Sequence, residues 1–204
     1  MWWRKKKEPI VAENTWLVIG LGNPGPGYAG NRHNVGQMVV DELAGRIGSK
    51  FTRHKTAAFV AEGFLAPGGP KVILAKPQSF MNLSGGPVAA LLRFYSLTPA
   101  KLIVVHDELD IPFDTIKLKS GGGHGGHNGL RDIAKAAETP DFLPVRVGIG
   151  RPPGRQDPAD FVLKDFGSTE RATLPSILAE AADAVELIAT DGLAAAQLKV
   201  HSPG

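Results

Sequence analysis

The chain has no cysteine among its 204 residues. Disulfide bonds, thiol nucleophiles and cysteine-ligated zinc are therefore excluded. It also lacks an apolar run long enough to span a membrane. The basic residues 1–7 are followed by Glu8, Pro9 and Glu13, which interrupt the apolar segment that a signal peptide needs. We therefore expect a cytoplasmic protein without a membrane anchor, in which residues 1–14 form a flexible tail.

A strong excess of charge is also missing, since the formal net charge is only +3. This mild basic balance permits a nucleic-acid partner but does not require one, and only a local cluster of cations would favour it. Hydrophobic residues make up 43% of the chain, which is enough for an ordinary globular core. The length favours one domain, which we expect over residues 15–204.

Short apolar runs bounded by glycine and proline predict strands at 16–19, 57–63, 72–75, 102–105, 116–118 and 145–149. The runs at 16–19 and 102–105 are apolar throughout, as in strands that are buried on both faces. Apolar residues at helical spacing predict helices from about Val35, Val88, Leu130 and Ser168, the last being one final helix. We expect a stiff surface loop at 151–158. The alternation of strands and helices predicts a three-layer α/β domain.

The first strand leads into Gly-Leu-Gly-Asn-Pro-Gly (20–25), which matches the dinucleotide-binding pattern G-x-G-x-x-G. That fingerprint requires a helix to begin inside the motif, so that its N-terminus meets the pyrophosphate. Here prolines and glycines keep residues 24–27 irregular, and the helical pattern begins only near Val35. We therefore favour a different ligand-binding loop at the carboxyl end of a central strand.

This loop carries several polar side chains, among them Asn23, His33 and Asn34. Asn34 directly precedes the helical pattern, and we interpret it as the helix cap. Asn23 has two interpretations, an Asx-turn or a functional amide. The loop alone does not decide between them, nor does it decide the role of His33.

A charged cluster, His106 to Asp110, follows the buried strand 102–105. It could be a metal site, a solvated loop, or the source of a carboxylate that orients the imidazole of His33. Successive strand residues face opposite sides, so His106 and Asp107 cannot both point into one crevice. We choose Asp107 as the orienting acid. Its carboxylate would accept a hydrogen bond from the proton-bearing ring nitrogen of His33. The other ring nitrogen would then be free to take a proton from water.

Four motifs occur in this order: Gly-Leu-Gly-Asn-Pro-Gly (20–25) with Tyr28 and Arg32-His33-Asn34, Lys76 to Gly85, His106 to Asp110, and Gly121 to Leu130. Together they resemble the bacterial-type peptidyl-tRNA hydrolases, and the similarity runs from about Trp16 to about His201. The resemblance implies a monomeric α/β/α fold with a twisted, mixed and largely parallel sheet. It also implies hydrolysis, without metal or cofactor, of the ester bond between a peptide and the 3′ ribose of tRNA.

By the same resemblance, His33 is the general base and Asp107 its partner. Asn23 helps to orient the water and the peptide, and to distinguish peptidyl from free aminoacyl ends. The residues implied in substrate binding are Tyr28, Phe80, Met81, Asn82 and Asn128. Amides both donate and accept hydrogen bonds, so they can bind a peptide backbone without selecting its side chains.

The segment from Gly121 to Gly129 holds six glycines among nine residues. It is either a flexible linker or a backbone-lined site beside a helix start. His124 and His127 are spaced as zinc ligands can be, but no clear third ligand lies nearby in the sequence.

Lys117 and Lys119 alternate with apolar residues along one strand, so both project from one face. A solvated sheet edge and a phosphate-binding surface would share this pattern. The family resemblance assigns both lysines, together with Arg146, to tRNA phosphates.

Two rival functions stay open at this point. One is a catalytically silent RNA-binding protein on the same scaffold. The other is a metal-dependent hydrolase that uses His106, Asp107, Asp110 and the histidines of the glycine-rich segment. The residues Asn23, His33, Asn82, Asp107 and Asn128 are all present, which favours the enzyme, because a pure binding protein needs no oriented base.

Overall fold

The computed structural model describes residues 14–119 and 123–201. The expected tail, apart from Asn14, lies outside the described residues, as do Gly121 and Gly122. Within the described part, one seven-stranded sheet has the order β2-β3-β4-β1-β5-β7-β6. Its strands are β1 (Thr15–Gly20), β2 (Thr52–His54), β3 (Ala58–Phe64), β4 (Lys71–Pro77), β5 (Leu102–Glu108), β6 (Ile116–Leu118) and β7 (Leu143–Gly148).

The sheet is mixed and largely parallel, as expected. Strands β4, β1, β5 and β7 run parallel to one another, while β2, β3 and β6 are paired antiparallel to their neighbours. All the predicted strands are present. The sequence does not predict β2, because Thr52-Arg53-His54 has no apolar run; this edge strand is defined by its pairing with β3.

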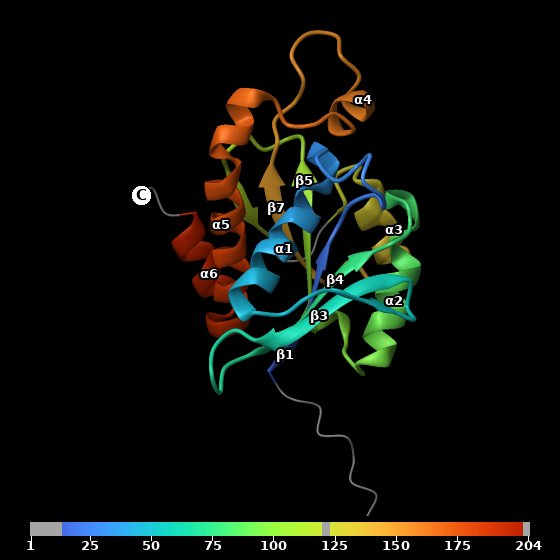
Figure 1. Ribbon diagram of the computed structural model, residues 1–204, viewed down its shortest axis with the longest axis vertical. Coiled ribbons are helices and arrows are strands. Elements are labelled where there is room, and N and C mark those ends of the chain that lie inside the picture. Colours follow the sequence, from blue (N-terminus) through green and yellow to red (C-terminus); the bar gives the residue numbers. More distant parts are fainter. Residues whose placement is uncertain (1–13, 120–122, 202–204) are drawn as a thin grey trace, which may run out of the picture.

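Helices cover both faces of the sheet (Figure 1). On one side lie α1 (Val35–Ile47), α5 (Ser168–Asp191) and α6 (Leu193–Val200), and on the other lie α2 (Gly85–Phe94) and α3 (Asn128–Ala136). The short helix α4 (Pro158–Val162) lies beyond the carboxyl ends of β5 and β7 (Figure 1). Three 3-10 turns complete the described elements: η1 (Arg32–Asn34), η2 (Met81–Leu83) and η3 (Pro99–Lys101).

The surface loop expected at 151–158 is present over 151–157. It ends one residue earlier than predicted, because Pro158 begins α4 behind Asp157, whose side chain accepts a hydrogen bond from the Ala159 amide. A second prediction about the C-terminal third was wrong. The expected single final helix is two helices. Gly192 separates α5 from α6 with a positive φ of 86°, a conformation that other residues rarely adopt.

The continuously apolar strands have partners on both faces of the sheet. Val18 of β1 packs into the core beneath α1 and α5, whereas Leu17 and Ile19 pack into the core beneath α2 and α3. Strand β5 divides in the same way, since Ile103 faces the first core and Leu102 the second. This double burial explains the absence of alternation in these two runs.

The parallel pairing of β1 with β5 determines where the candidate site forms. Gly20 at the end of β1 lies opposite Val105 of β5. The loops that follow both strands therefore leave the sheet at the same edge. This places the segment that holds His33 beside the one that holds Asp107.

Close packing of α1 on the sheet depends on Gly36. A Cβ atom at this position would overlap the carbonyl oxygen of Val105 in β5, whereas a Cβ at Gly45 of the same helix meets nothing within 4 Å. We therefore expect Gly36→Ala to lower the free energy of unfolding by about 1–3 kcal/mol. Gly45→Ala, the matched control, is expected to raise it by about 0.5–1 kcal/mol. Urea unfolding of both variants measures the difference, and equal stabilities would contradict this packing.

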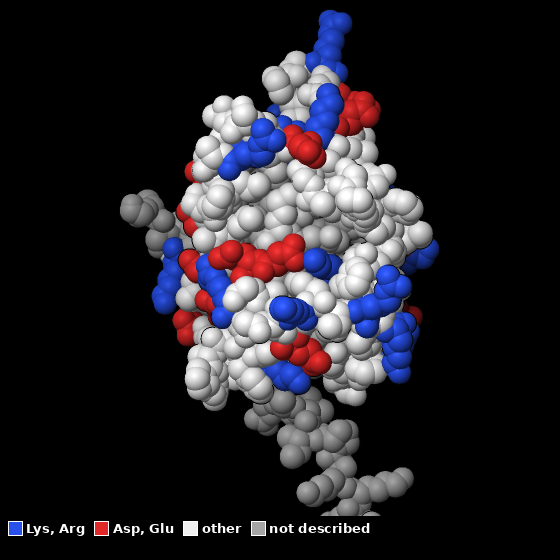
Figure 2. All heavy atoms as spheres, viewed as in Figure 1, with Lys and Arg blue, Asp and Glu red and all other residues white. Residues whose placement is uncertain are grey.

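Charged side chains of both signs are mixed on the face formed by α1 and α5 (Figure 2). Arg46 of α1 contributes to this pattern by pairing with Glu42, Asp183 and Glu186. Among the described helices, none combines the length and the apolar character needed to cross a membrane.

Candidate active site

The side chains of His33 and Asp107 meet where β1 and β5 end. Nδ1 of His33, in η1, lies 2.8 Å from Oδ2 and 3.0 Å from Oδ1 of Asp107. The carboxylate is buried, with 3% of its surface exposed, while the imidazole retains 15%. An ionised carboxylate only accepts hydrogen bonds, so Nδ1 of His33 carries a proton. In the neutral ring, Nε2 therefore holds a lone pair, and no hydrogen bond from the described residues occupies it.

A second histidine, His127, binds the same carboxylate. Its Nε2 lies 2.9 Å from Oδ1 of Asp107. Its Nδ1 accepts hydrogen bonds from the backbone amides of Gly129 and Leu130, at 3.1 and 3.3 Å, and so caps the N-terminus of α3. Because Nδ1 accepts, the proton must reside on Nε2, which donates to Asp107. His127 is thus a neutral ring with a fixed tautomer.

The electrostatic environment favours a charged Asp107. Burial alone would raise the pKa of its carboxyl group, but the charge of His33 and the hydrogen bonds from His127 and His33 outweigh burial and lower the pKa well below its usual range. For His33, burial would lower the pKa, whereas the charge and the hydrogen bond of Asp107 act in the other direction and raise it above 6.5. The pair therefore combines a permanent anion with an imidazole of increased basicity.

His106 lies behind this pair and does not enter the cleft. Its ring is 1% exposed, its Nδ1 lies 2.7 Å from the backbone oxygen of Asp107, and its centroid lies 4.9 Å from that of His127. Burial, followed by the neighbouring His127, lowers the pKa of His106 to about 3. His106 is consequently a neutral packing partner, on the opposite face of β5 from Asp107, as the alternation of strand residues predicts.

Asn23 is held through both its side chain and its backbone. Its Oδ1 accepts a hydrogen bond of 2.7 Å from the Met81 amide, and its backbone N and O both pair with the side chain of Asn34, each at 2.9 Å. Asn23 therefore forms no Asx-turn. The predicted cap at Asn34 was wrong: this side chain makes no capping bond to α1, because the backbone of Asn23 occupies it.

These groups open into a cavity of about 540 Å³. Besides His33 and Asp107, its lining includes five more of the predicted residues: Asn23, Phe80, Met81, Asn82 and Asn128. Oδ1 of Asn23 is already bound, so its amide nitrogen is the group left to donate into the cavity. The volume is of the order of a small-ligand site.

A family model described as peptidyl-tRNA hydrolase matches residues 17–204. The chain belongs to the peptidyl-tRNA hydrolase family. Two of its relatives, the peptidyl-tRNA hydrolases of Pseudarthrobacter chlorophenolicus and Leifsonia xyli, are each 64% identical to it. The first comparison spans 92% of this chain and 96% of the relative, and the second 94% and 100%.

Solved structures agree with this assignment. The crystal structure of peptidyl-tRNA hydrolase from Acinetobacter baumannii superimposes with a TM-score of 0.85 at 36% identity, covering 93% of this chain and 95% of that one. A peptidyl-tRNA hydrolase complex with N-propanol gives the same TM-score and identity, over 94% of this chain and 97% of that one. The protein is thus a hydrolase with the α/β fold of the peptidyl-tRNA hydrolase family.

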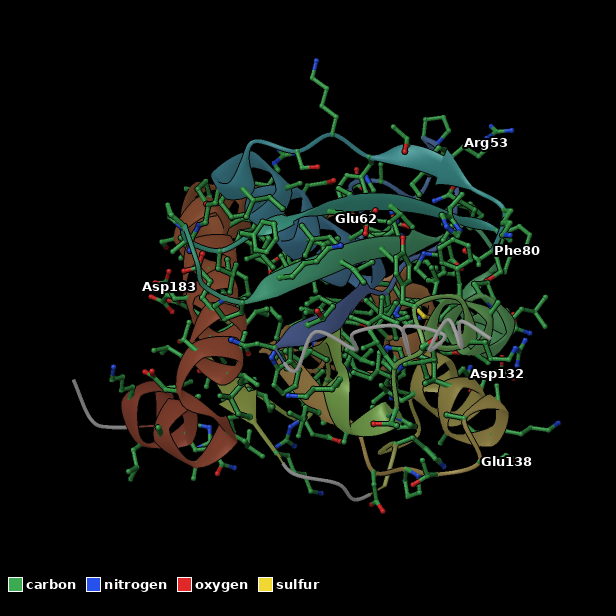
Figure 3. The ribbon with its side chains drawn as sticks, turned by 90° about the horizontal axis from the view of Figure 1, so that it is seen from below. Arg53, Glu62, Phe80, Asp132, Glu138 and Asp183 are labelled. Atoms are coloured by element: carbon green, nitrogen blue, oxygen red, sulfur yellow. The ribbon has the colours of Figure 1, made fainter. Side chains whose placement is uncertain are left out.

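The two aromatic residues that the resemblance places at the pocket differ in position. Phe80 lines the cavity and is 53% exposed; it lies at the margin of the molecule in Figure 3. Tyr28 is not among the lining residues. Its ring meets that of Phe80 edge-on, with centroids 6.2 Å apart, so Tyr28 packs against a residue of the cavity wall.

The wall that carries Met81 and Asn82 is connected to α3. Asp132 of α3 accepts a hydrogen bond of 2.8 Å from the amide of Gly85, the first residue of α2 (Figure 3). This contact joins the start of α2 to the middle of α3, and cavity residues lie shortly before α2 and at the start of α3.

The three predicted phosphate contacts lie outside the cavity lining. Lys117 of β6 is paired in register with Arg146 of β7, so their side chains lie on the same face of the sheet. Lys117 and Lys119 are exposed, and Arg146 is half-buried. The structure thus brings two of these cations side by side at the β6 edge and places the third just beyond the end of β6.

Among the described residues, one group has the composition of a metal site: His33, Asp107 and His127, with ligand atoms within 4.8 Å of one another. It does not include His106, Asp110 or His124, which the sequence also suggested. The ring nitrogens of His33 and His127 that face Asp107 are both hydrogen-bonded to it. An ion placed between them would have to replace those bonds.

Sequence reasoning missed two features of the site. It did not pair His127 with Asp107; the available signal was its place directly before the helix pattern that starts at Asn128. It also missed the part of the cavity wall that is formed by α4, which includes Ala159 and Val162. The signal for α4 was Asp157-Pro158, an acidic cap followed by proline in the first turn.

Proposed function

We propose that this chain hydrolyses the ester bond between a peptide and the 3′ ribose of tRNA, with His33 as the base. The observation that carries the proposal is the hydrogen bond of 2.8 Å between Nδ1 of His33 and Asp107. It directs the other ring nitrogen toward the cavity as a proton acceptor. Family membership supplies the substrate class.

In this mechanism a water molecule beside Nε2 of His33 attacks the ester carbonyl carbon. Its proton passes to Nε2, and Asp107 stabilises the resulting imidazolium. The carbonyl oxygen becomes an oxyanion, for which the amide nitrogen of Asn23 is a suitable donor. When the tetrahedral intermediate collapses, the carbon–oxygen bond to the ribose breaks and the 3′ oxygen takes the proton back from His33. One such oxyanion donor contributes about 2.7–4 kcal/mol in other hydrolases.

Asn82 and Asn128 are assigned to the peptide backbone and the 3′ nucleotide. Both side chains are exposed, line the cavity and make no hydrogen bond to other described residues. Their amides are therefore available for a ligand that needs both donors and acceptors. We propose a monomeric enzyme, as the family resemblance implies. Because translation supplies the substrate, we place the enzyme in the cytoplasm.

The test of the proposed function compares N-acetylaminoacyl-tRNA with free aminoacyl-tRNA as substrates. We expect release of the blocked amino acid at a much higher rate, with and without EDTA. Loss of activity in EDTA that one divalent metal restores would instead favour a metal-dependent hydrolase. Binding of both tRNAs without hydrolysis of either would favour a pure RNA-binding protein.

The surface of Lys117, Lys119 and Arg146 is proposed to bind tRNA phosphates. We expect Lys117→Ala to raise KM for peptidyl-tRNA with little change in kcat, and to reduce the slope of log affinity against log salt concentration by up to about 0.9, the value for one phosphate contact. The matched control is Lys50→Ala, an exposed lysine next to β2 at the opposite edge of the sheet. Equal salt slopes for the two variants would show that Lys117 does not contact tRNA phosphates.

A further inference from the structure

The cavity has a second wall that the proposed chemistry does not use. It is formed by Pro158, Ala159 and Val162 of α4, followed by Leu163. Leu163 is 44% exposed, and the wall is apolar. A wall made of a five-residue helix and its flanking loops has few backbone bonds of its own, so its position depends on what anchors it.

The anchor is the residue next to the proposed base. Arg32 is 8% exposed, and its guanidinium carbon lies 3.9 Å from the centre of the Phe161 ring in α4. Its Nη1 donates to the backbone oxygen of Phe161 at 3.2 Å, and its Nη2 lies 2.7 Å from Oε1 of Glu170 in α5. One planar guanidinium thus holds the ring and the backbone of α4 and a carboxylate at the start of α5.

Further hydrogen bonds of backbone and side-chain groups continue the same connection. The Arg32 amide donates to the oxygen of Lys164 at 3.0 Å, and the side chain of Asn31 donates to Asp165 at 2.7 Å. Glu170 also accepts a hydrogen bond of 2.8 Å from the Gly167 amide. Residues 161–170 are therefore attached to the turn η1 that carries His33, from both the guanidinium and the main chain.

We propose that Arg32 and Glu170 are positioning residues that fix the α4 wall relative to His33 and so set the width of the cleft for the peptide part of the substrate. The inference rests on the proposed function. Neither residue lines the cavity, so we assign neither of them a contact with the peptide part of the substrate. Loss of the ion pair leaves a buried guanidinium without its anion, which favours displacement of the segment that it holds.

Glu170→Gln is the sharpest variant. Its side-chain oxygen can still accept from the Gly167 amide, so the start of α5 keeps its cap, while the negative charge facing Arg32 is lost. We expect KM to rise about tenfold for a tRNA carrying a blocked peptide of several residues. KM for N-acetylaminoacyl-tRNA should rise less, because it fills less of the cleft. The catalytic constant and the pH profile should stay unchanged, since the pair of His33 and Asp107 is intact.

Arg46→Lys is the matched control. Arg46 also joins α1 to α5 through ion pairs, with Asp183 at 2.7 Å and Glu186 at 3.4 Å, but it does not line the cavity or contact α4. Replacing Arg46 by lysine should leave KM for both substrates unchanged. Arg32→Lys keeps the positive charge but loses the planar guanidinium with its several donors. It should therefore raise KM as Glu170→Gln does. Thermal unfolding of each variant separates loss of fold from loss of affinity.

Three results would overturn the inference. The first is a KM for the longer substrate that is the same in Glu170→Gln, Arg32→Lys and Arg46→Lys. The second is an equal rise for both substrate lengths. The third is a fall in kcat at constant KM, which would mean that the pair moves His33 and not the wall. If the wild-type enzyme did not hydrolyse either substrate, the proposed function would be wrong, and the inference with it. If the wild-type enzyme were active but the variants had an unchanged KM, only the inference would be wrong.

Discussion

Replacing His33 by alanine is expected to lower kcat/KM for peptidyl-tRNA by about 10²–10⁴-fold, the usual contribution of a general base. The reason is that Nε2 of His33 is the proposed proton acceptor, which the hydrogen bond between Nδ1 and Asp107 directs toward the cavity. The affinity for tRNA should be largely retained, because the proposed phosphate contacts lie at the β6 edge. Initial rates on N-acetylaminoacyl-tRNA, together with a binding titration, measure both quantities.

The control for this variant is His54→Ala. His54 lies on β2, packs against Phe94 with ring centroids 4.6 Å apart, and does not line the cavity. Its replacement should leave kcat/KM unchanged. If His33→Ala retained wild-type turnover, another group would have to be the base.

Asp107→Asn is expected to be nearly as damaging as the loss of the histidine, although it changes only one atom. The cause lies in His127, whose Nδ1 is occupied by two backbone amides of α3, so that Nε2 must donate toward residue 107. The oxygen of an asparagine at 107 will therefore face His127, and its amide nitrogen will face His33. The shortest contact of His33, 2.8 Å to Oδ2, then becomes a contact with a donor.

A donor at that position favours the other tautomer of His33, in which Nδ1 accepts and Nε2 carries the proton. Such a ring cannot take a proton from water. The equivalent change in a Ser-His-Asp triad lowers kcat by about 10⁴-fold, and we expect a loss of roughly that order here. Single-turnover hydrolysis measures it, and activity within a few-fold of wild type would show that the tautomer of His33 is not fixed by Asp107.

The sequence allowed the pair of His33 and Asp107 to be predicted because strand ends in a parallel sheet share an edge. The apolar runs at 16–19 and 102–105 identified the two central strands, and the polar residues after each run were then neighbours by topology. Alternation along β5 correctly separated His106 from Asp107. These inferences rest on local periodicity and simple geometry, which a single sequence contains.

The remaining features depend on contacts that leave no local pattern. Arg32 and Glu170 are separated by 138 positions, and neither stands in a motif that indicates the other. The cap expected at Asn34 failed for a related reason. A preference for asparagine at helix starts is a local tendency, and here the backbone of Asn23 competes for the same side chain. His127 was missed because histidine is an uncommon cap, so its place directly before a helix did not by itself indicate a fixed ring.

The effect of Asp107 on the pKa of His33 is measured most directly by the pH dependence of kcat/KM in the wild-type enzyme and in Asp107→Asn. A base acts only when neutral, so activity falls as the pH drops through the pKa of His33. Asp107 raises that pKa above 6.5 against the opposing effect of burial, so the wild-type inflection should lie above 6.5. In Asp107→Asn the raising influences are lost and burial remains, which moves the residual inflection to lower pH. Coincident inflections in the two proteins would contradict the proposed role of the carboxylate.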